Sequence, residues 1–409
     1  MKRLTLLLLG LALGVSATAG AQGLTMQMSN GWSFSFSGNV NAFWVFTKAN
    51  NSGPANSSVR TGLLPTFATF DARGKEGGLN LGVHFGFAPQ IQNAGIHDQF
   101  VGTSVQAGAQ IDMRQVYLTI GLKNGSQILA GRELGLFSRQ NILNDMTLFG
   151  VGAVGIPGVT LGAGSNPPQG GGTTLGRIGY GYIYPNFNPQ VTYSTKPGQS
   201  QFSIGLFQPS VNGAFDVTKI PRVEAEFTYN QKSGKNNYMF WVGGLWQSAS
   251  DAVTGGNTAS SFGGTAGIKA GVSDLSIVVN GYIGKGLGTT LMFSGLGGGG
   301  VSTGGTELRS SDGGYVQLMY KVSPKTNVGA SWGFSRLKNN SATVAAGGDG
   351  NEAVRSNLYS YTAGIYHQWT KSLKLVLEGT QEGTTGIIGI AGSPGAKMIN
   401  ISGGFMLFF

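Results

Sequence analysis

The chain has 409 residues, of which only 11% are charged, 71 are glycine and none is cysteine. Ordinary soluble domains carry about 25% charged residues and about 7% glycine, so the composition is not that of a typical soluble enzyme. The formal net charge is +10, but the basic residues are spread singly along the chain, which argues against a nucleic-acid-binding patch.

The first 21 residues have the features of a secretory signal peptide. Lys2 and Arg3 precede an almost wholly apolar stretch from 4 to 15, and small residues end the segment at Ala19-Gly-Ala21. A basic start, a short apolar core and an A-x-A site are typical of export signals, and the apolar run is shorter than the roughly 20 residues that span a membrane. We predict cleavage before Gln22, which leaves residues 22–409 as one exported domain.

The clearest local pattern lies between Trp32 and Phe46. Aromatic and apolar residues occupy the even positions, whereas serine and asparagine occupy most of the odd ones. Successive side chains of a strand point to opposite faces, so this segment predicts a strand with one apolar face and one polar face. The pattern is longer than the usual strand of a soluble sandwich, about 5–6 residues, and is long enough for a tilted membrane strand.

Fifteen further segments show the same kind of pattern, and short turns alternate with long loops between them. The predicted strands are 32–46, 64–73, 78–88, 111–122, 126–134, 177–194, 201–208, 222–231, 238–247, 262–272, 275–285, 315–322, 327–337, 359–369, 373–381 and 397–409. This rhythm predicts an all-β fold, a transmembrane antiparallel β-barrel with sixteen strands, short periplasmic turns and long external loops. The strand that ends at Phe409 should pair with the first strand and close the barrel, because lipid does not tolerate a free edge.

A long insert separates the predicted strands 126–134 and 177–194. From Gln140 to Gly176 its only charged residue is Asp145. Long loops are usually functional or disordered, and disordered segments are normally rich in charge. We therefore predict that this third external loop folds into the lumen and narrows it, with Asp145 facing an arginine-rich wall.

Several charged residues lie inside predicted strands, where a guanidinium facing lipid would cost about 2–4 kcal/mol at the midplane. They are Arg73, Arg114, Arg132, Arg177, Arg222, Glu224 and Glu226. We expect them to face the lumen or a rim, with Arg177 opposite the face of Ile178, Tyr180 and Tyr182. Rings of charge commonly give pores their ion selectivity, but these residues could also be solvated wall residues without a selective role.

Aromatic residues near strand ends are typical of the girdles at membrane interfaces. The functional alternative is that these aromatic rings stack on sugars. The candidates are Trp44, Phe46, Tyr182, Tyr184, Trp246, Trp332 and Trp369.

Two enzyme-like patterns lack the structural context that they require. Gly329-Ala-Ser-Trp-Gly333 matches G-x-S-x-G, but it continues a strand pattern where a hydrolase needs a sharp strand-to-helix turn. The glycine-rich stretch 295–300 opens no predicted helix, and the three histidines lack metal-ligand spacing. We therefore predict no enzymatic activity, no cofactor and no metal site.

Several short motifs resemble those of the Gram-negative general (non-specific) porins of the trimeric sixteen-stranded type. They are Arg114-Gln-Val-Tyr-Leu118, the Asn124-Gly125 turn, Leu129-Ala-Gly-Arg132, Tyr182-Ile-Tyr-Pro-Asn-Phe187, Val191-Thr-Tyr-Ser194 and the terminal Phe409. The resemblance implies a homotrimer of water-filled barrels in the outer membrane, through which small hydrophilic solutes and ions diffuse passively. It also implies a constriction between loop carboxylates and a basic ladder on the facing wall.

On this resemblance Arg114, Arg132 and Arg177 stand where the ladder is expected, Arg73 lies nearer a turn, and Asp145 is the loop carboxylate. The loop differs from the family in being longer, richer in glycine and limited to one carboxylate from Gln140 onward. Three functions therefore stay open. They are a general porin with a mild anion preference, a substrate-specific channel for anionic metabolites or phosphate, and a barrel for surface interaction.

Overall fold

The computed structural model describes residues 23–50, 55–92, 111–157, 173–210, 215–251, 257–293, 308–338, 358–385 and 395–409. The predicted signal peptide lies outside these residues and stays a prediction. Among the described residues, no helix is both long enough and apolar enough to cross a membrane.

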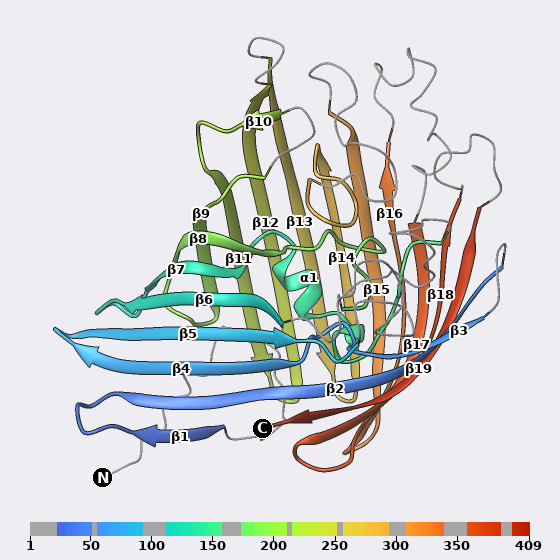
Figure 1. Cartoon of the computed structure of the whole chain (residues 1–409), viewed down its shortest axis with the longest axis horizontal. Coiled ribbons are helices and arrows are strands. Elements are labelled where there is room, and N and C mark those ends of the chain that lie inside the picture. Colours follow the sequence, from blue (N-terminus) through green and yellow to red (C-terminus); the bar gives the residue numbers. More distant parts are fainter. Residues whose placement is uncertain are drawn as a thin grey trace, which may run out of the picture.

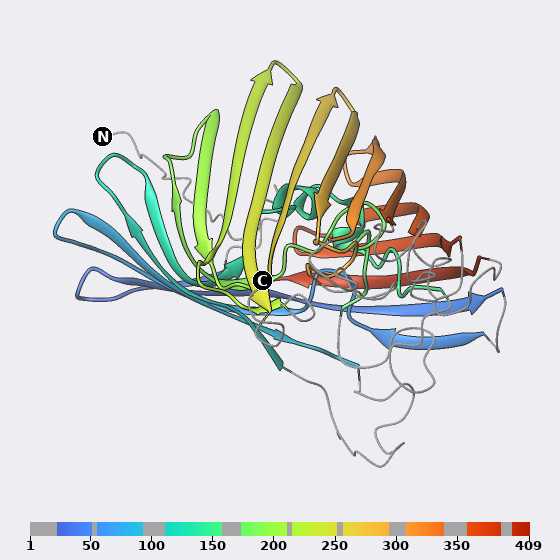
Figure 2. The same ribbon diagram turned by 90° about the horizontal axis from the view of Figure 1, so that it is seen from above.

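Sixteen antiparallel strands form a closed barrel (Figures 1 and 2). They are β2 (Ser33–Ala49), β4 (Phe67–Glu76), β5 (Leu79–Pro89), β6 (Ile111–Gly121), β7 (Gln127–Leu134), β8 (Phe187–Ser194), β9 (Ser200–Phe207), β11 (Arg222–Ser233), β12 (Asn236–Asp251), β13 (Thr258–Val272), β14 (Leu275–Lys285), β15 (Ser310–Ser323), β16 (Thr326–Leu337), β17 (Leu358–Gln368), β18 (Leu373–Thr384) and β19 (Lys397–Phe408). Each predicted strand corresponds to one of them, so the predicted fold class and strand number are confirmed.

Three short strands join the ends of the barrel strands. β1 (Leu24–Gln27) and β3 (Asn56–Arg60) pair with β2, and β10 (Phe215–Val217) pairs with β12.

The last long strand closes the barrel against the first. β19 pairs antiparallel with β2, from Met398 opposite Ala49 to Phe408 opposite Asn39. Phe409 extends this contact, because its ring centroid lies 5.2 Å from that of Phe36. The predicted closure is therefore confirmed, and the ring of strands has no free edge.

The two faces of the wall differ as the alternation predicts. In β2, Val40 and Trp44 are exposed on the outside, whereas Asn39 and Asn41 are buried on the inside. Exposed large apolar residues recur on the outer face of most strands, for example Leu377 in β18. A continuous apolar outer face is what a transmembrane barrel requires, so the structure is a barrel of the outer-membrane type.

One predicted strand begins much later than expected. β8 starts at Phe187, and the preceding residues 177–186 form a loop because Gly179 and Gly181 have φ angles of +81° and +154°. The expected alternation around Arg177 was therefore wrong. Tyr182 is fully buried inside the barrel, so its expected place in an interface girdle was also wrong.

Candidate functional site

Residues 135–186, which connect β7 to β8, form a segment that we call the interior loop. It contains α1 (Arg139–Leu143) and the 3-10 helix η1 (Met146–Phe149), and Figure 2 shows α1 inside the ring of strands. Many of its apolar side chains pack in one cluster with inward-facing wall residues such as Trp241 and Tyr315, and others form two smaller clusters. The described parts of the interior loop are thus bound to the wall by apolar contacts as well as by the hydrogen bonds described below.

Two glutamates of β11 hold the first part of the interior loop. The Oε2 atom of Glu224 accepts hydrogen bonds from the backbone N–H groups of Leu136 (2.7 Å) and Phe137 (2.9 Å). Glu226 forms an ion pair of 2.6 Å with Arg139 at the start of α1. Arg222 donates from Nε to the other oxygen of Glu224 over 2.8 Å. Arg222, Glu224 and Glu226 are all buried on the inner face. The two glutamates bind the loop, and Arg222 binds Glu224 and the hydroxyl of Ser210 (2.9 Å).

Two glutamates of β18, nearly opposite β11 in the ring, hold the next part of the loop. Glu378 accepts hydrogen bonds from the N–H groups of Val151 (2.7 Å) and Gly152 (2.8 Å), and the hydroxyl of Tyr366 donates to its other oxygen. Glu382 accepts from the N–H of Val154 over 3.2 Å. Buried backbone N–H groups need acceptors, and at these positions of the loop carboxylates of the wall provide them.

Glu378 and Glu382 are not among the residues predicted from the sequence, although a signal for them was present. Leu373, Leu375 and Leu377 occupy every second position, so they share one face of the strand. Glu378 and Glu382 occupy even-numbered positions and therefore lie on the opposite face. The reasoning that selected Glu224 and Glu226 would have found Glu378, whereas Glu382 lies just beyond the predicted strand 373–381 and inside the longer observed β18.

Asp145 lies inside the loop rather than at the surface of a water-filled channel. Its carboxylate caps η1 by accepting from the N–H of Thr147 (2.9 Å), and it accepts from the hydroxyl of Tyr182 (2.9 Å). The residue is 3% exposed. Burial raises the pKa of Asp145, and the charge of Arg177 opposes that rise. The expectation that Asp145 faces an arginine-rich wall is therefore corrected, because its carboxylate is engaged within the loop.

Arg177 is part of the interior loop and not of the wall. It donates from Nε to the hydroxyl of Ser331 (2.9 Å) and from Nη1 to the hydroxyl of Ser360 (3.1 Å), and its guanidinium lies over the Tyr315 ring. Its exposed fraction is 0%, and burial lowers the pKa of Arg177. Arg177 thus attaches the end of the loop to β16 and β17. Because Ser331 occupies a straight strand, it lacks the sharp turn of a hydrolase nucleophile.

The remaining predicted arginines do not form one ladder. Arg114 is the extra residue where the β5–β6 register shifts, and it binds Asp112 (2.9 Å) and the hydroxyl of Tyr184 (3.3 Å) at the end of the interior loop. This contact corrects the expected girdle position of Tyr184. Arg73 lies near the periplasmic end of β4, is half exposed and forms a 3.3 Å ion pair with Asp71.

Arg132 lies on the outer face of the wall by strand register, although we expected it to face the lumen or a rim. It pairs with Val116 of β6 and with Pro189 of β8, which puts it on the face of Ala130 and Val191. Val191 is exposed on the outside of the barrel. The strand register therefore assigns Arg132 to the outer face, and its neighbour Glu133 to the inner face.

Three lysines near the periplasmic end carry inward-facing charge that is open to water. Lys75 shares the face of His84, Lys232 the face of Glu226, and Lys321 the face of Gln317. All three are exposed, and within the described part of the chain none forms an ion pair. The inner-face carboxylates, by contrast, are engaged with the loop or with neighbouring wall residues.

No group of three or more His, Cys, Asp or Glu residues that could hold a metal ion occurs among the residues that the structure describes. The glycine-rich stretch 295–300 lies outside them.

Comparisons with known proteins identify the fold. No protein-family model and no curated protein matches the chain. Among solved structures, the outer membrane channel DcaP of Acinetobacter baumannii is 14% identical with a TM-score of 0.63, over 94% of this chain and 99% of that one. The anion-selective porin from Comamonas acidovorans is 12% identical with a TM-score of 0.61, over 92% and 100%. The outer membrane protein OmpT of Vibrio cholerae, in a trimer form, is 13% identical with a TM-score of 0.50, over 93% and 100%. The fold is that of the Gram-negative outer-membrane porins.

Proposed function

We propose that the protein is an outer-membrane porin through which small hydrophilic solutes diffuse passively, with a mild preference for anions. One observation supports the preference above all others. The carboxylates Glu224, Glu226, Glu378 and Glu382 are buried against the interior loop, whereas inward-facing lysines at the periplasmic end are exposed. Charges that remain in contact with water attract permeating counter-ions, so the accessible field of the bore is positive.

Selectivity measurements in planar bilayers test the proposal. Under a salt gradient, the wild-type channel should give a reversal potential of the sign that anion flux produces. Replacing Lys75, Lys232 and Lys321 together by glutamine should move that potential toward the cation side. The matched control replaces Lys48, Lys219 and Lys285, which are exposed at the external end of the barrel. If no conductance is observed, the porin proposal is wrong. If the triple variant and the control give equal reversal potentials, the three lysines do not set the preference for anions.

A second candidate is a substrate-specific channel for anionic metabolites or phosphate. The extensive packing of the interior loop favours it, because the loop binds wall residues of β11, β15, β16 and β18. A selective channel should show small conductance steps that one anion blocks at low concentration. A general porin should show large ohmic steps with no such block.

We also propose that the barrel assembles as a homotrimer. Support comes from the fold, which it shares with a protein solved in a trimer form. Mass measurement of the detergent-solubilised protein, before and after heating, distinguishes a trimer from a monomer.

A further inference from the structure

A second segment of the chain enters the barrel beside the interior loop. Residues 286–293, which follow β14 and which we call the inward segment, are buried from Gly286 to Thr290. The N–H of Tyr184, in the interior loop, donates to the carbonyl oxygen of Thr290 over 2.9 Å, and an isolated bridge pairs Tyr184 with Leu291. The inward segment therefore lies inside the ring of strands, in contact with the last part of the interior loop.

Leu287 attaches the start of the inward segment to the wall. Its side chain is fully buried in a cluster with Leu245 of β12 and Tyr282 of β14. A Cβ atom at either Gly263 or Gly284 would lie 2.5 Å from Cδ1 of Leu287, so these two glycines leave the space that the leucine fills. Gly263 and Gly284 are opposite each other on β13 and β14, and Gly284 shares the inner face with Tyr282. The inner face of the wall is thus shaped to receive this side chain.

Phe293 attaches the other end of the inward segment. Its side chain is 5% exposed. The central carbon of the Arg222 guanidinium lies 5.6 Å from the ring centroid of Phe293 and 5.6 Å from that of Phe207, and such contacts between a cation and aromatic rings are attractive. Because Arg222 also binds Glu224, which holds the interior loop, this arginine connects the wall with both segments.

Between these two attachments the inward segment presents Leu291 to water. The side chain is 38% exposed, although residues 286–290 before it are buried. The bridge to Tyr184 keeps its backbone inside the ring of strands. A barrel of sixteen strands is wide enough to leave an aqueous channel, and a segment inside the ring occupies part of that cross-section. Leu291 borders the space that remains.

We propose that the inward segment is a second constriction element, which together with the interior loop sets the upper size of the solutes that pass. This inference rests on the proposed channel function and assigns residues to its size limit. Leu287 and Phe293 hold the segment in place, and Leu291 narrows the path. Since the side chains that hold and form the element are apolar, it acts on the size of a solute and not on the sign of its charge.

Swelling of liposomes that contain the barrel tests the size limit. The probes are two uncharged sugars, arabinose as the small one and sucrose as the large one. Leu287→Ala with Phe293→Ala removes both attachments, and the loss of two buried side chains should detach the segment from the wall. The swelling rate in sucrose should rise several-fold relative to the rate in arabinose. The reversal potential under a salt gradient should stay that of wild type.

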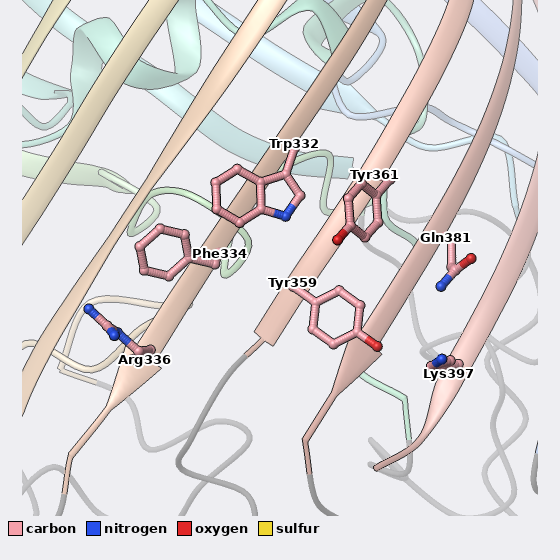
Figure 3. Close-up of a pocket in the computed structure, with 7 residues that line it drawn as sticks. All are labelled: Trp332, Phe334, Arg336, Tyr359, Tyr361, Gln381 and Lys397. Atoms are coloured by element: carbon pink, nitrogen blue, oxygen red, sulfur yellow. The ribbon is translucent and has the colours of Figure 1, made fainter.

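The matched control makes the same two substitutions on the lipid-facing side of the wall. Leu318→Ala with Phe334→Ala truncates a leucine of β15 and a phenylalanine of β16, and Phe334 lines a cleft on the outer face of the barrel (Figure 3). This control should keep the wild-type ratio of the two swelling rates. Heat-modified gel mobility verifies that both double variants are folded. Equal ratios in the folded double variant and in its control would overturn the inference.

A single-cysteine variant tests the place of Leu291 without removing an attachment. The chain contains no cysteine, so Leu291→Cys supplies the only thiol. A bulky maleimide bound there should lower the single-channel conductance, because it enlarges the group that borders the path. The control is Lys285→Cys, at an exposed position on the outer face of β14, where the same label should leave the conductance unchanged.

The outcomes separate this inference from the channel function on which it rests. Complete labelling of Leu291→Cys, verified by mass, without a fall in conductance would overturn the inference and leave the channel function intact. A wild-type barrel that gives no conductance would overturn the channel function, and the inference with it.

Discussion

Removing the carboxylate of Glu378 should release the middle of the interior loop. This side chain is 1% exposed and accepts two backbone N–H groups, from Val151 and Gly152, on one oxygen. Glu378→Ala leaves these donors without their acceptor at a buried site. The barrel strand itself should remain, because its ladder with β17 and β19 involves only backbone groups.

The size of the effect on the loop follows from its two lost hydrogen bonds; the hydrogen bond from Tyr366, which is also lost, lies within the wall. A buried donor left unsatisfied costs about 1–3 kcal/mol, so the pair amounts to about 2–6 kcal/mol. A change of this size multiplies the ratio of released to docked loop by roughly 30 to 10⁴. Water that enters the space vacated by the side chain will hydrogen-bond to the N–H groups and bring the effect toward the lower value.

Single-channel recording measures the result. Glu378→Ala should add larger conductance steps or raise the time spent in them, and Glu378→Gln, which keeps one acceptor oxygen, should have a smaller effect. Thr380→Ala is the matched control, because Thr380 is the next inward-facing residue of β18 and bonds Thr362 rather than the loop. Traces of Glu378→Ala that equal those of wild type would refute the reasoning. Equal changes in Glu378→Ala and Thr380→Ala would assign the effect to general packing of the wall.

Three further predictions concern the same structure. Gly150→Ala should give conductance steps like those of Glu378→Ala, because a Cβ atom at Gly150 would lie 2.1 Å from Oε1 of Glu378. Because burial raises the pKa of Asp145, the protonated carboxyl is favoured in the packed loop. Raising the pH from below the ordinary pKa of aspartate should therefore weaken the packing of the loop and increase the conductance fluctuations. Asp145→Asn should remove that pH dependence. Phe409→Ala loses the ring contact with Phe36 and should lower the temperature at which heating changes the gel mobility of the barrel, by comparison with wild type.

The strands were predictable because their signal is local. In a membrane barrel each residue faces either lipid or the interior, so a pattern such as that of Trp32 to Phe46 reports the wall directly. The order of short and long connections then gave the sixteen strands and the closure at Phe409. Neither inference needed knowledge of contacts between segments that are distant in sequence.

The loop contacts were not predictable in the same way. Residues 177–184 alternate like a strand, and only the positive φ angles of Gly179 and Gly181 show that the backbone is a loop. A register shift made Arg114 face inward while the regular pairing of β7 assigned Arg132 to the outer face. Such irregularities depend on tertiary packing, which overrides local patterns.

The roles of loop and wall are reversed relative to the arrangement that the porin resemblance implied. There, the loop presents carboxylates to a basic wall; here, β11 and β18 present Glu224 and Glu378 to the backbone N–H groups of the loop. A loop that is held through its backbone needs few charged side chains of its own, which accounts for the nearly uncharged, glycine-rich sequence between β7 and β8. It follows that substitutions of the wall carboxylates should change how firmly the loop is docked, and that ion selectivity should respond chiefly to charges outside the loop contacts.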